Sequence, residues 1–334
     1  MSNPLLSSAE LPEFSKIKPE HIQPAVEQAI AKCRETIEVL LAKNSQYTWD
    51  NLIEPLEDVD DELSKMWSPV SHMNSVISSD ELRDAHDACL PLLSDYGTYV
   101  GQHQGLYEAY KSIHESTDFA QLTQAQKMVI EQSLRDFELS GIGLDDSQKA
   151  RYGEMVKRLS ELTSNFSNQL LDATEAWTKL ITDEADLAGL PESAIAAAKA
   201  MADAKEQKGW LFTLDFPSYL PVMTYSENRE LREECYRAFV TRASDQGPNA
   251  GEFDNTNNMN EIVALRHELA NLLGFASYAD KSLATKMAEN PAQVLGFLNE
   301  LGERSKDQAS TELAELRAFA KDHYNVTEMA SWDL

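Results

Sequence analysis

The sequence predicts a mainly α-helical protein with one small antiparallel β element. Apolar residues recur at spacings of three and four along most of the 334 residues. Gly and Pro are sparse, at 13 and 12 residues, while helix-favouring residues are plentiful. Only the runs 177–182 and 210–216 have the short, β-branched or aromatic character of strands. With 42% hydrophobic residues, the chain can build a sizeable core.

The first 18 residues are expected to form an extended arm, because prolines recur there. Pro19 then occupies a favourable first helical position, so a helix is predicted from Pro19 to about Lys43. One face of this helix is apolar and carries Ile22, Val26, Ile30 and Leu40.

Three further helices are predicted before the middle of the chain. Trp49 begins an amphipathic helix that Pro69 is expected to interrupt. A second helix is predicted from about Asp80 to Tyr110. Gly141 and Gly143 are expected to close the third, which carries Leu134 and Phe137 on its apolar side.

The segment 147–176 has the clearest helical period in the chain. The two predicted strands follow, at 177–182 and 210–216. Between them lies an alanine-rich helix that Pro191 opens and that ends near Gly209.

Helices are expected to resume after Pro217 and Pro221. The last helix is expected to start at Pro291, with Asn290 as its N-cap, and to end near Tyr324. The preceding helices are predicted at about 227–242, 257–274 and 276–288, with a long loop at 243–256. The expected organisation is an arm at 1–18, a helical bundle at 19–176, a small β-containing subregion at 177–225, and helices at 226–334.

Composition disfavours nucleic acid and membranes as partners and indicates the compartment. The formal net charge of −27 disfavours nucleic acid, whose phosphates would be repelled. No run of apolar residues approaches the ~18 needed for a membrane span, and the N-terminus has no signal-peptide pattern. Three separated cysteines suit a reducing compartment. We therefore expect a cytoplasmic protein that contacts neither nucleic acid nor membrane.

Local motifs give no catalytic, cofactor-binding or metal-binding residue. None of the seven histidines lies four residues from another, and the nearest zinc-peptidase pattern is H-E-L-A-N at 267–271. Asn271 is a very poor zinc ligand where a second imidazole is needed, so His267 and Glu268 are interpreted as ordinary helix residues. No G-x-S-x-G pattern or phosphate-binding glycine loop is present either.

Longer blocks of sequence are more informative. They include LRHELANLLGFASYADKSLATKMAENP at 265–291, WTKLITDEADLAGLPE at 177–192, LDFPSYLPVMTY at 214–225 and TRASDQGPNAGEFDN at 241–255. Others are YTWDNLIEPLEDVDDELSKMWSPVSHMNSV at 47–76, RDFELSGIGL at 135–144 and the stretch at 3–30. In order and spacing, these blocks resemble the N-terminal half of the thimet-oligopeptidase family of metallopeptidases.

The resemblance implies a neurolysin-like, multi-helical lobe beside a deep channel that admits short, unfolded peptides. In this family a second lobe carries H-E-F-G-H and a downstream glutamate, which hold one zinc ion. The first motif glutamate activates the zinc-bound water for attack on a peptide carbonyl. The intact parent is therefore expected to be a zinc metalloendopeptidase.

The sequence stops at Leu334, before any H-E-x-x-H motif. We therefore expect a truncated chain that binds no zinc and is inactive alone. Its expected partners are the catalytic lobe and other copies of itself, which would associate through an exposed apolar patch. Its channel wall is expected to include 243–256 and 257–274, although a surface loop and a packed helix are equally compatible with these segments. Tyr219 and Tyr225 could contact substrate, but anchoring of the chain is favoured.

Two alternatives remain open from the residues alone. One is a self-contained helical scaffold or peptide-binding module without catalysis, which the helical periodicity would also suit. The other is an independent metalloenzyme, which the histidine spacing disfavours. A reading frame that continues into H-E-x-x-H would favour the oligopeptidase interpretation.

Overall fold

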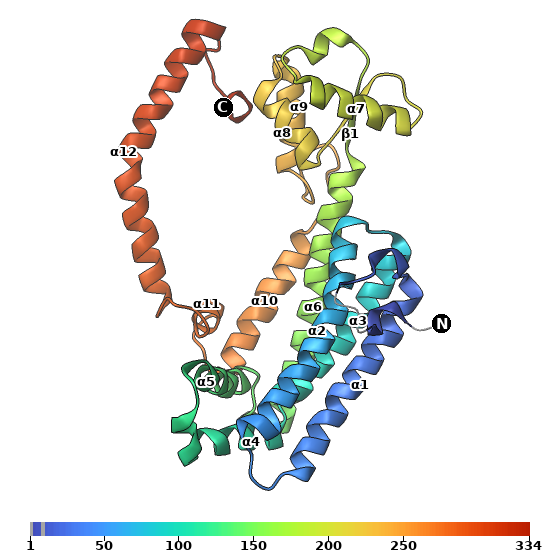
Figure 1. Cartoon of the computed structure of the whole chain (residues 1–334). Helices are drawn as coiled ribbons and strands as arrows, with labels where there is room; N and C mark the ends of the chain where they lie inside the picture. The colour runs from blue at the N-terminus through green and yellow to red at the C-terminus, as the bar shows by residue number, and fades with distance from the viewer. Residues whose placement is uncertain (1–2, 8–10) are drawn as a thin grey trace. The chain divides into compact units, whose positions relative to one another are not determined.

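The protein is mainly α-helical, which confirms the predicted fold class (Figure 1). The structure is a computed structural model and describes residues 3–7 and 11–334. Its α-helices are α1 (Pro19–Lys43), α2 (Glu54–Val76), α3 (Asp80–Gly101), α4 (Gln104–His114), α5 (Gln124–Leu139), α6 (Asp146–Ala176), α7 (Glu192–Ala204), α8 (Phe216–Tyr225), α9 (Arg229–Val240), α10 (Thr256–Leu272), α11 (Tyr278–Leu283) and α12 (Pro291–Tyr324). The strands are β1 (Thr178–Ile181) and β2 (Trp210–Thr213). Within the described ranges, no helix combines the length and apolar character needed to cross a bilayer.

The chain forms two compact units. Unit 1 comprises residues 1–164 and 264–281, and unit 2 comprises residues 165–263 and 282–334. The division of the sequence at residues 19, 177 and 226 remains a prediction, and positions 1–2 and 8–10 of the expected arm lie outside the described residues.

In unit 1, helix α1 packs against both α2 and α3 (Figure 1). Pro19 occupies the first turn of α1, where a missing backbone N–H costs least. The apolar face predicted for this helix is buried in the core, at Ile22, Val26 and Ile30. The same core continues through Leu52, Val70, Leu106 and Ile130, so it draws on α2, α4, α5 and the turn before α2.

The interruption predicted at Pro69 is wrong, because α2 continues through this residue to Val76. The proline ring removes one backbone donor from the helix, which ordinarily kinks or ends it. Here Pro69 is buried on the same face of α2 as Met66 and Val70, and burial of its apolar ring favours this helix despite the lost hydrogen bond. Trp49 begins a single π-helical turn, and α2 itself starts at Glu54.

The single helix predicted from Asp80 to Tyr110 is also wrong, since two helices occupy this segment. Helix α3 ends at Gly101, and α4 begins at Gln104. The His103 ring accepts a hydrogen bond from the Leu106 backbone N–H at 3.2 Å, which caps the new helix. Histidine is an uncommon N-cap residue, so the sequence pattern gave no signal for this break.

Unit 2 contains the predicted antiparallel pair, in which Thr178 faces Thr213 and Ile181 faces Trp210. Phe212 of β2 is almost fully buried in the core of this unit. Strand β2 stops at Thr213, whose backbone N–H donates to Ser218 Oγ at 3.0 Å rather than continuing the ladder.

Helix α8 corrects the expectation that helices resume only after Pro221. Pro217 lies in the first turn of α8, where proline is well tolerated, and Pro221 lies inside the helix. Val222 is fully buried in the core, which holds this short helix in place despite its second proline.

Helix α12 begins as predicted. The Asn290 side chain accepts a hydrogen bond from the Gln293 backbone N–H at 2.9 Å, and Pro291 takes the first helical position. Asn325, in the left-handed conformation, ends the helix. None of the 34 residues of α12 is buried.

We expect Ile22→Ala to lower the free energy of unfolding by about 2–5 kcal/mol, because it leaves a cavity in the unit 1 core. Ile22 is 0% exposed, whereas Val39 on the same helix is 52% exposed. Val39→Ala is the matched control and should change stability by less than about 0.5 kcal/mol. Urea unfolding followed by circular dichroism measures both, and equal effects would contradict the described packing of α1.

Candidate functional site

The H-E-L-A-N turn of α10 has its polar groups engaged with one another and with a neighbouring helix. His267 Nε2 lies 2.9 Å from Asn271 Nδ2, the side chain one turn further along. Asn271 thus holds the place that a second zinc-binding imidazole would need. Among residues 3–7 and 11–334, no group of three or more His, Cys, Asp and Glu side chains could hold a metal ion.

Glu268 forms a bidentate ion pair with Arg151 of α6. Arg151 Nε donates to Oε1 at 2.7 Å, and Nη2 donates to Oε2 at 2.8 Å. Hydrogen bonding to this guanidinium lowers the pKa of the Glu268 carboxyl. Both oxygens are therefore occupied, which leaves this carboxylate poorly suited to accept a proton from a water molecule.

The loop at 243–256 is anchored within unit 2 by buried asparagine contacts. Asn255 is buried and donates from Nδ2 to the Phe166 carbonyl at 3.0 Å. Asn258, in the first turn of α10, donates to Asn255 Oδ1 at 2.8 Å and to Gln169 Oε1 at 3.0 Å. The loop is therefore held against the C-terminal half of α6 by side-chain amides.

Gly247 gives this loop its turn. Its φ of +81° is in the region that glycine adopts without strain, and a Cβ here would lie 1.9 Å from Thr241 Oγ1. After the loop, α10 exposes two apolar side chains one turn apart, Met259 and Val263. These two side chains are the exposed large apolar groups at the start of the segment 257–274, for which a channel wall and a packed helix were equally compatible with the sequence.

The two tyrosines singled out in the sequence have different environments. The Tyr219 ring stacks on Phe239 with centroids 4.1 Å apart, and burial raises the pKa of its hydroxyl. The Arg242 guanidinium lies 3.7 Å from the Phe239 centroid. Tyr219 therefore packs α8 against α9, whereas Tyr225 is exposed at the end of α8.

A charged anchor joins the segment after α12 to α9, and no local sequence pattern indicates it. Arg229 donates to both oxygens of Asp333 at 2.9 and 2.7 Å, and Arg232 adds a hydrogen bond at 3.0 Å. The Asp333 side chain is only 4% exposed, and these arginines lower its pKa to about 2. Arg232 also donates to the Trp332 carbonyl at 2.8 Å. Figure 1 shows the C-terminus beside α8 and α9.

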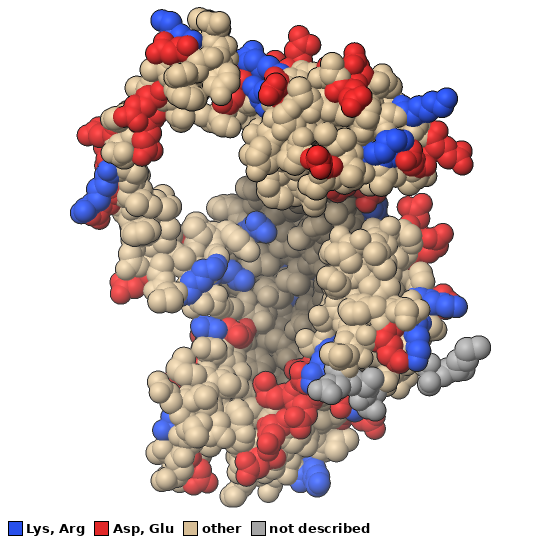
Figure 2. Space-filling view, turned by 45° about the horizontal axis from the view of Figure 1, so that its top comes forward, with Lys and Arg blue, Asp and Glu red and all other residues tan. Residues whose placement is uncertain are grey.

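Helix α12 itself presents a row of exposed apolar side chains. Figure 2 shows it as an arm on which charged and uncharged side chains alternate. Six of its seven leucines and phenylalanines are 48% to 65% exposed, namely Leu295, Phe297, Leu298, Leu301, Leu316 and Phe319. An apolar row of this size typically marks a surface that another protein element covers.

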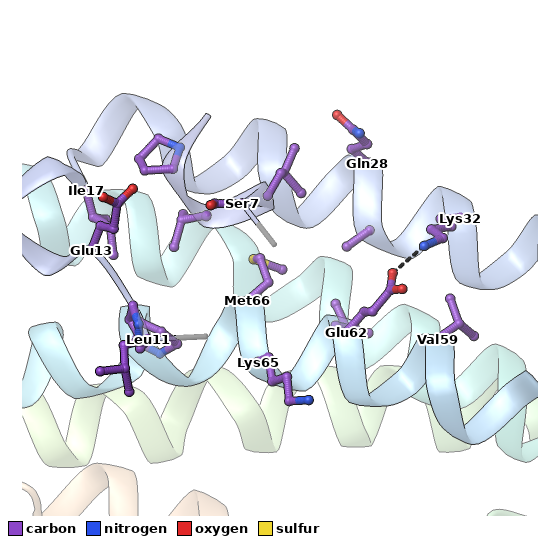
Figure 3. A pocket seen from close by; sticks show the side chains of 17 residues that line it. Ser7, Leu11, Glu13, Ile17, Gln28, Lys32, Val59, Glu62, Lys65 and Met66 are labelled. Atoms are coloured by element: carbon purple, nitrogen blue, oxygen red, sulfur yellow. Dashed lines mark hydrogen bonds and ion pairs between the residues drawn. The ribbon is translucent and has the colours of Figure 1, made fainter. Parts of the chain in front are cut away.

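A further cavity lies in unit 1, between α1, α2 and the described part of the N-terminal arm (Figure 3). Its volume is about 670 Å³, and Lys32 and Glu62 form an ion pair at one edge. Ser7 and Leu11 line it on either side of positions 8–10, which the structure does not describe. We assign this cavity no function.

Two family models match separate parts of the chain. Residues 26–149 match the model described as Neurolysin/Thimet oligopeptidase, N-terminal domain, and residues 222–334 match Peptidase family M3. The two matched segments flank the β-containing part of unit 2.

Curated relatives match this chain along its whole length. Oligopeptidase A of Escherichia coli (strain K12) is 60% identical over 334 residues, which are 100% of this chain and 49% of the relative. Oligopeptidase A of Salmonella typhimurium gives the same identity and coverage. A probable cytosolic oligopeptidase A of Arabidopsis thaliana is 36% identical over 342 residues, covering 48% of its length. The chain thus spans about half the length of the curated relatives it matches.

The ion pairs of Asp333 predict how the free energy of unfolding depends on pH. The folded-state pKa of Asp333, about 2, is below the ~3.9 of an unfolded aspartate. Its stabilisation is therefore fully present above about pH 4 and is lost as the pH falls towards 2. We expect Asp333→Asn to cost about 2 kcal/mol at pH 7, measured by urea unfolding, with a difference that narrows between pH 4 and pH 2.

Asp307→Asn is the control, because Asp307 is an exposed residue of α12. It should unfold as the wild-type protein does. Equal stability of wild type and Asp333→Asn at pH 7 would contradict the anchoring role.

Proposed function

The chain belongs to peptidase family M3, and from this premise we propose that it supplies the peptide-binding half of a zinc oligopeptidase. The observation that carries the proposal is the 60% identity that extends along the whole chain but over only 49% of E. coli oligopeptidase A. The intact enzyme would hydrolyse short, unfolded peptides in the cytoplasm. A relative named as a probable cytosolic oligopeptidase A and the three free cysteines of this chain support this location.

The described residues do not fit a catalytic zinc site. Such a site takes three protein ligands, and in this class two are histidines one helical turn apart. The nearest arrangement offers Asn271 beside His267, with Glu268 already paired to Arg151. We therefore assign the zinc ligands and the general base to residues outside 1–334, and no step of hydrolysis to this chain.

The role left to this chain is to bind and orient the peptide. We propose that the loop at 243–256 and the exposed apolar residues of α10 form part of the channel wall. The asparagine contacts that anchor this loop support the proposal, because a rigid wall loses less conformational entropy when a peptide binds.

The apolar row of α12 is the proposed contact surface for the catalytic lobe. Buried against that lobe, its leucines and phenylalanines would gain about 25 cal/mol for each Å² of apolar surface removed from water. Without the lobe, the same surface would favour association between copies of residues 1–334.

A chimaera tests this function directly. Residues 1–334 replace the corresponding half of E. coli oligopeptidase A, and the products are assayed with an internally quenched peptide. We expect the chimaera to hydrolyse the peptide and a chelator to abolish this activity, because the catalytic half carries the metal. Residues 1–334 alone should show no turnover with added zinc or cobalt.

The intact E. coli enzyme is the positive control, and metal analysis after dialysis accompanies each assay. Stoichiometric zinc in residues 1–334, or turnover that His267→Ala removes, would contradict the assignment of the metal. A folded but inactive chimaera would instead favour a self-contained helical peptide-binding module.

A further inference from the structure

A groove between α2 and α5 in unit 1, the α2–α5 groove, is built from side chains of α1 to α5. Its volume of about 500 Å³ lies within the range of ~300–1,000 Å³ that is usual for small-ligand sites. Its wall is rich in aromatic groups, namely Trp67, Tyr96, Tyr110 and Phe137. The groove can therefore accommodate an extended apolar stem.

The polar side of this groove is lined by acidic residues. Glu57 and Asp60 of α2 line it one helical turn apart, and Asp136 of α5 lines it from the opposite helix. Arg135 donates two hydrogen bonds to Asp136, at 3.0 and 2.9 Å. Within the described chain, Glu57 and Asp60 form no ion pair, and no Lys or Arg lines the groove.

Both residues are exposed at the rim of the groove, but neighbouring protein atoms displace part of the water around their carboxylates. Burial raises the pKa of Asp60, although its Oδ1 accepts a hydrogen bond from the Tyr96 hydroxyl at 2.8 Å. Burial also raises the pKa of Glu57, and repulsion by the Asp60 charge adds to this effect. A positive group between them would offset the free-energy cost of desolvation and counter the repulsion between the two carboxylates.

We propose that the α2–α5 groove binds a lysine or arginine side chain of a short peptide. The methylene stem would lie along the aromatic wall, and the charged head would pair with Glu57 and Asp60. That the ligand is a peptide rests on the proposed function, whereas the selection of a cation rests on the groove alone. A metal ion fits less well, since the described residues place no third metal-binding side chain beside these two carboxylates.

Binding of a matched peptide pair to residues 1–334 measures this selection. The probes are acetyl-Ala-Ala-Lys-Ala-Ala-amide and the same peptide with norleucine in place of lysine, titrated by calorimetry. Norleucine keeps an apolar stem and removes the charge. We expect the lysine peptide to bind about tenfold more tightly, because its ammonium pairs with partly desolvated carboxylates.

Variants locate this preference in the groove. The double substitution Glu57→Gln and Asp60→Asn keeps both hydrogen-bonding groups but removes their charges, and it should abolish the preference for lysine. Asp58→Asn is the matched control, because Asp58 lies on the same helix but does not line the groove. It should leave the preference intact.

A steric variant separates the groove from a general charge effect. Gly97 of α3 lines the groove, and a Cβ added there meets no atom within 4 Å. Gly97→Leu can therefore be accommodated at its Cβ, adds apolar bulk to the lining of the groove without changing any charge, and favours the helix. We expect it to weaken binding of both peptides, with the circular dichroism spectrum unchanged.

Each contrary result overturns a stated part of the inference. Equal affinity for the two peptides would exclude selection of a cation. If the double variant still prefers the lysine peptide, the cation-binding site lies outside this groove. Wild-type binding by Gly97→Leu would exclude the groove. Binding of n-butylamine as tight as that of the lysine peptide would exclude a peptide-specific site. An inactive chimaera with intact lysine selection would contradict the proposed function alone.

Discussion

A shortage of positive charge constrains this protein. The chain has 56 acidic and 29 basic residues, so about half of its carboxylates cannot have a cation of their own. A carboxylate can be buried at low cost only where a cation or several donors accompany it. The positions of the arginines therefore decide which acidic residues hold the structure together. Asp333, with two arginines, has a lowered pKa, whereas Asp60, with a tyrosine hydroxyl and no cation, has a raised one.

Helix ends were predictable where the signal is local. Pro19, Asn290 and Gly141 act through their own backbone or through a side chain a few residues away, so the boundaries they predict lie close to those observed. The errors at Pro69 and Pro221 have the opposite origin. Whether a helix tolerates an internal proline depends on the packing around it, and that packing comes from other elements. No pattern along the chain contains this information.

The candidate site shows the same division between local and distant information. Asn271 alone was enough to disfavour a zinc site, because the required spacing of four residues is local. The partner of Glu268 could not be predicted, since Arg151 is 117 positions away. The acidic pair in the α2–α5 groove could be predicted only in part. Its one-turn spacing is visible in the sequence, but the lack of an opposing cation depends on how α3, α4 and α5 surround it. Family resemblance supplied the class of protein and none of these contacts.

Helix α12 is held by means that differ from those of the core helices. A helix of 34 residues is long enough to retain structure in water with a good cap, and Asn290 provides one. Yet none of its side chains is buried, so apolar packing within unit 2 does not position it. Its attachment at the C-terminal end depends on Asp333 and the arginines of α9. Because this carboxylate is almost fully buried, salt screens the contact much less than it screens a surface ion pair. The buried charge of Asp333 and the contacts of Trp332 can thus hold a helix whose apolar row remains open for another protein element.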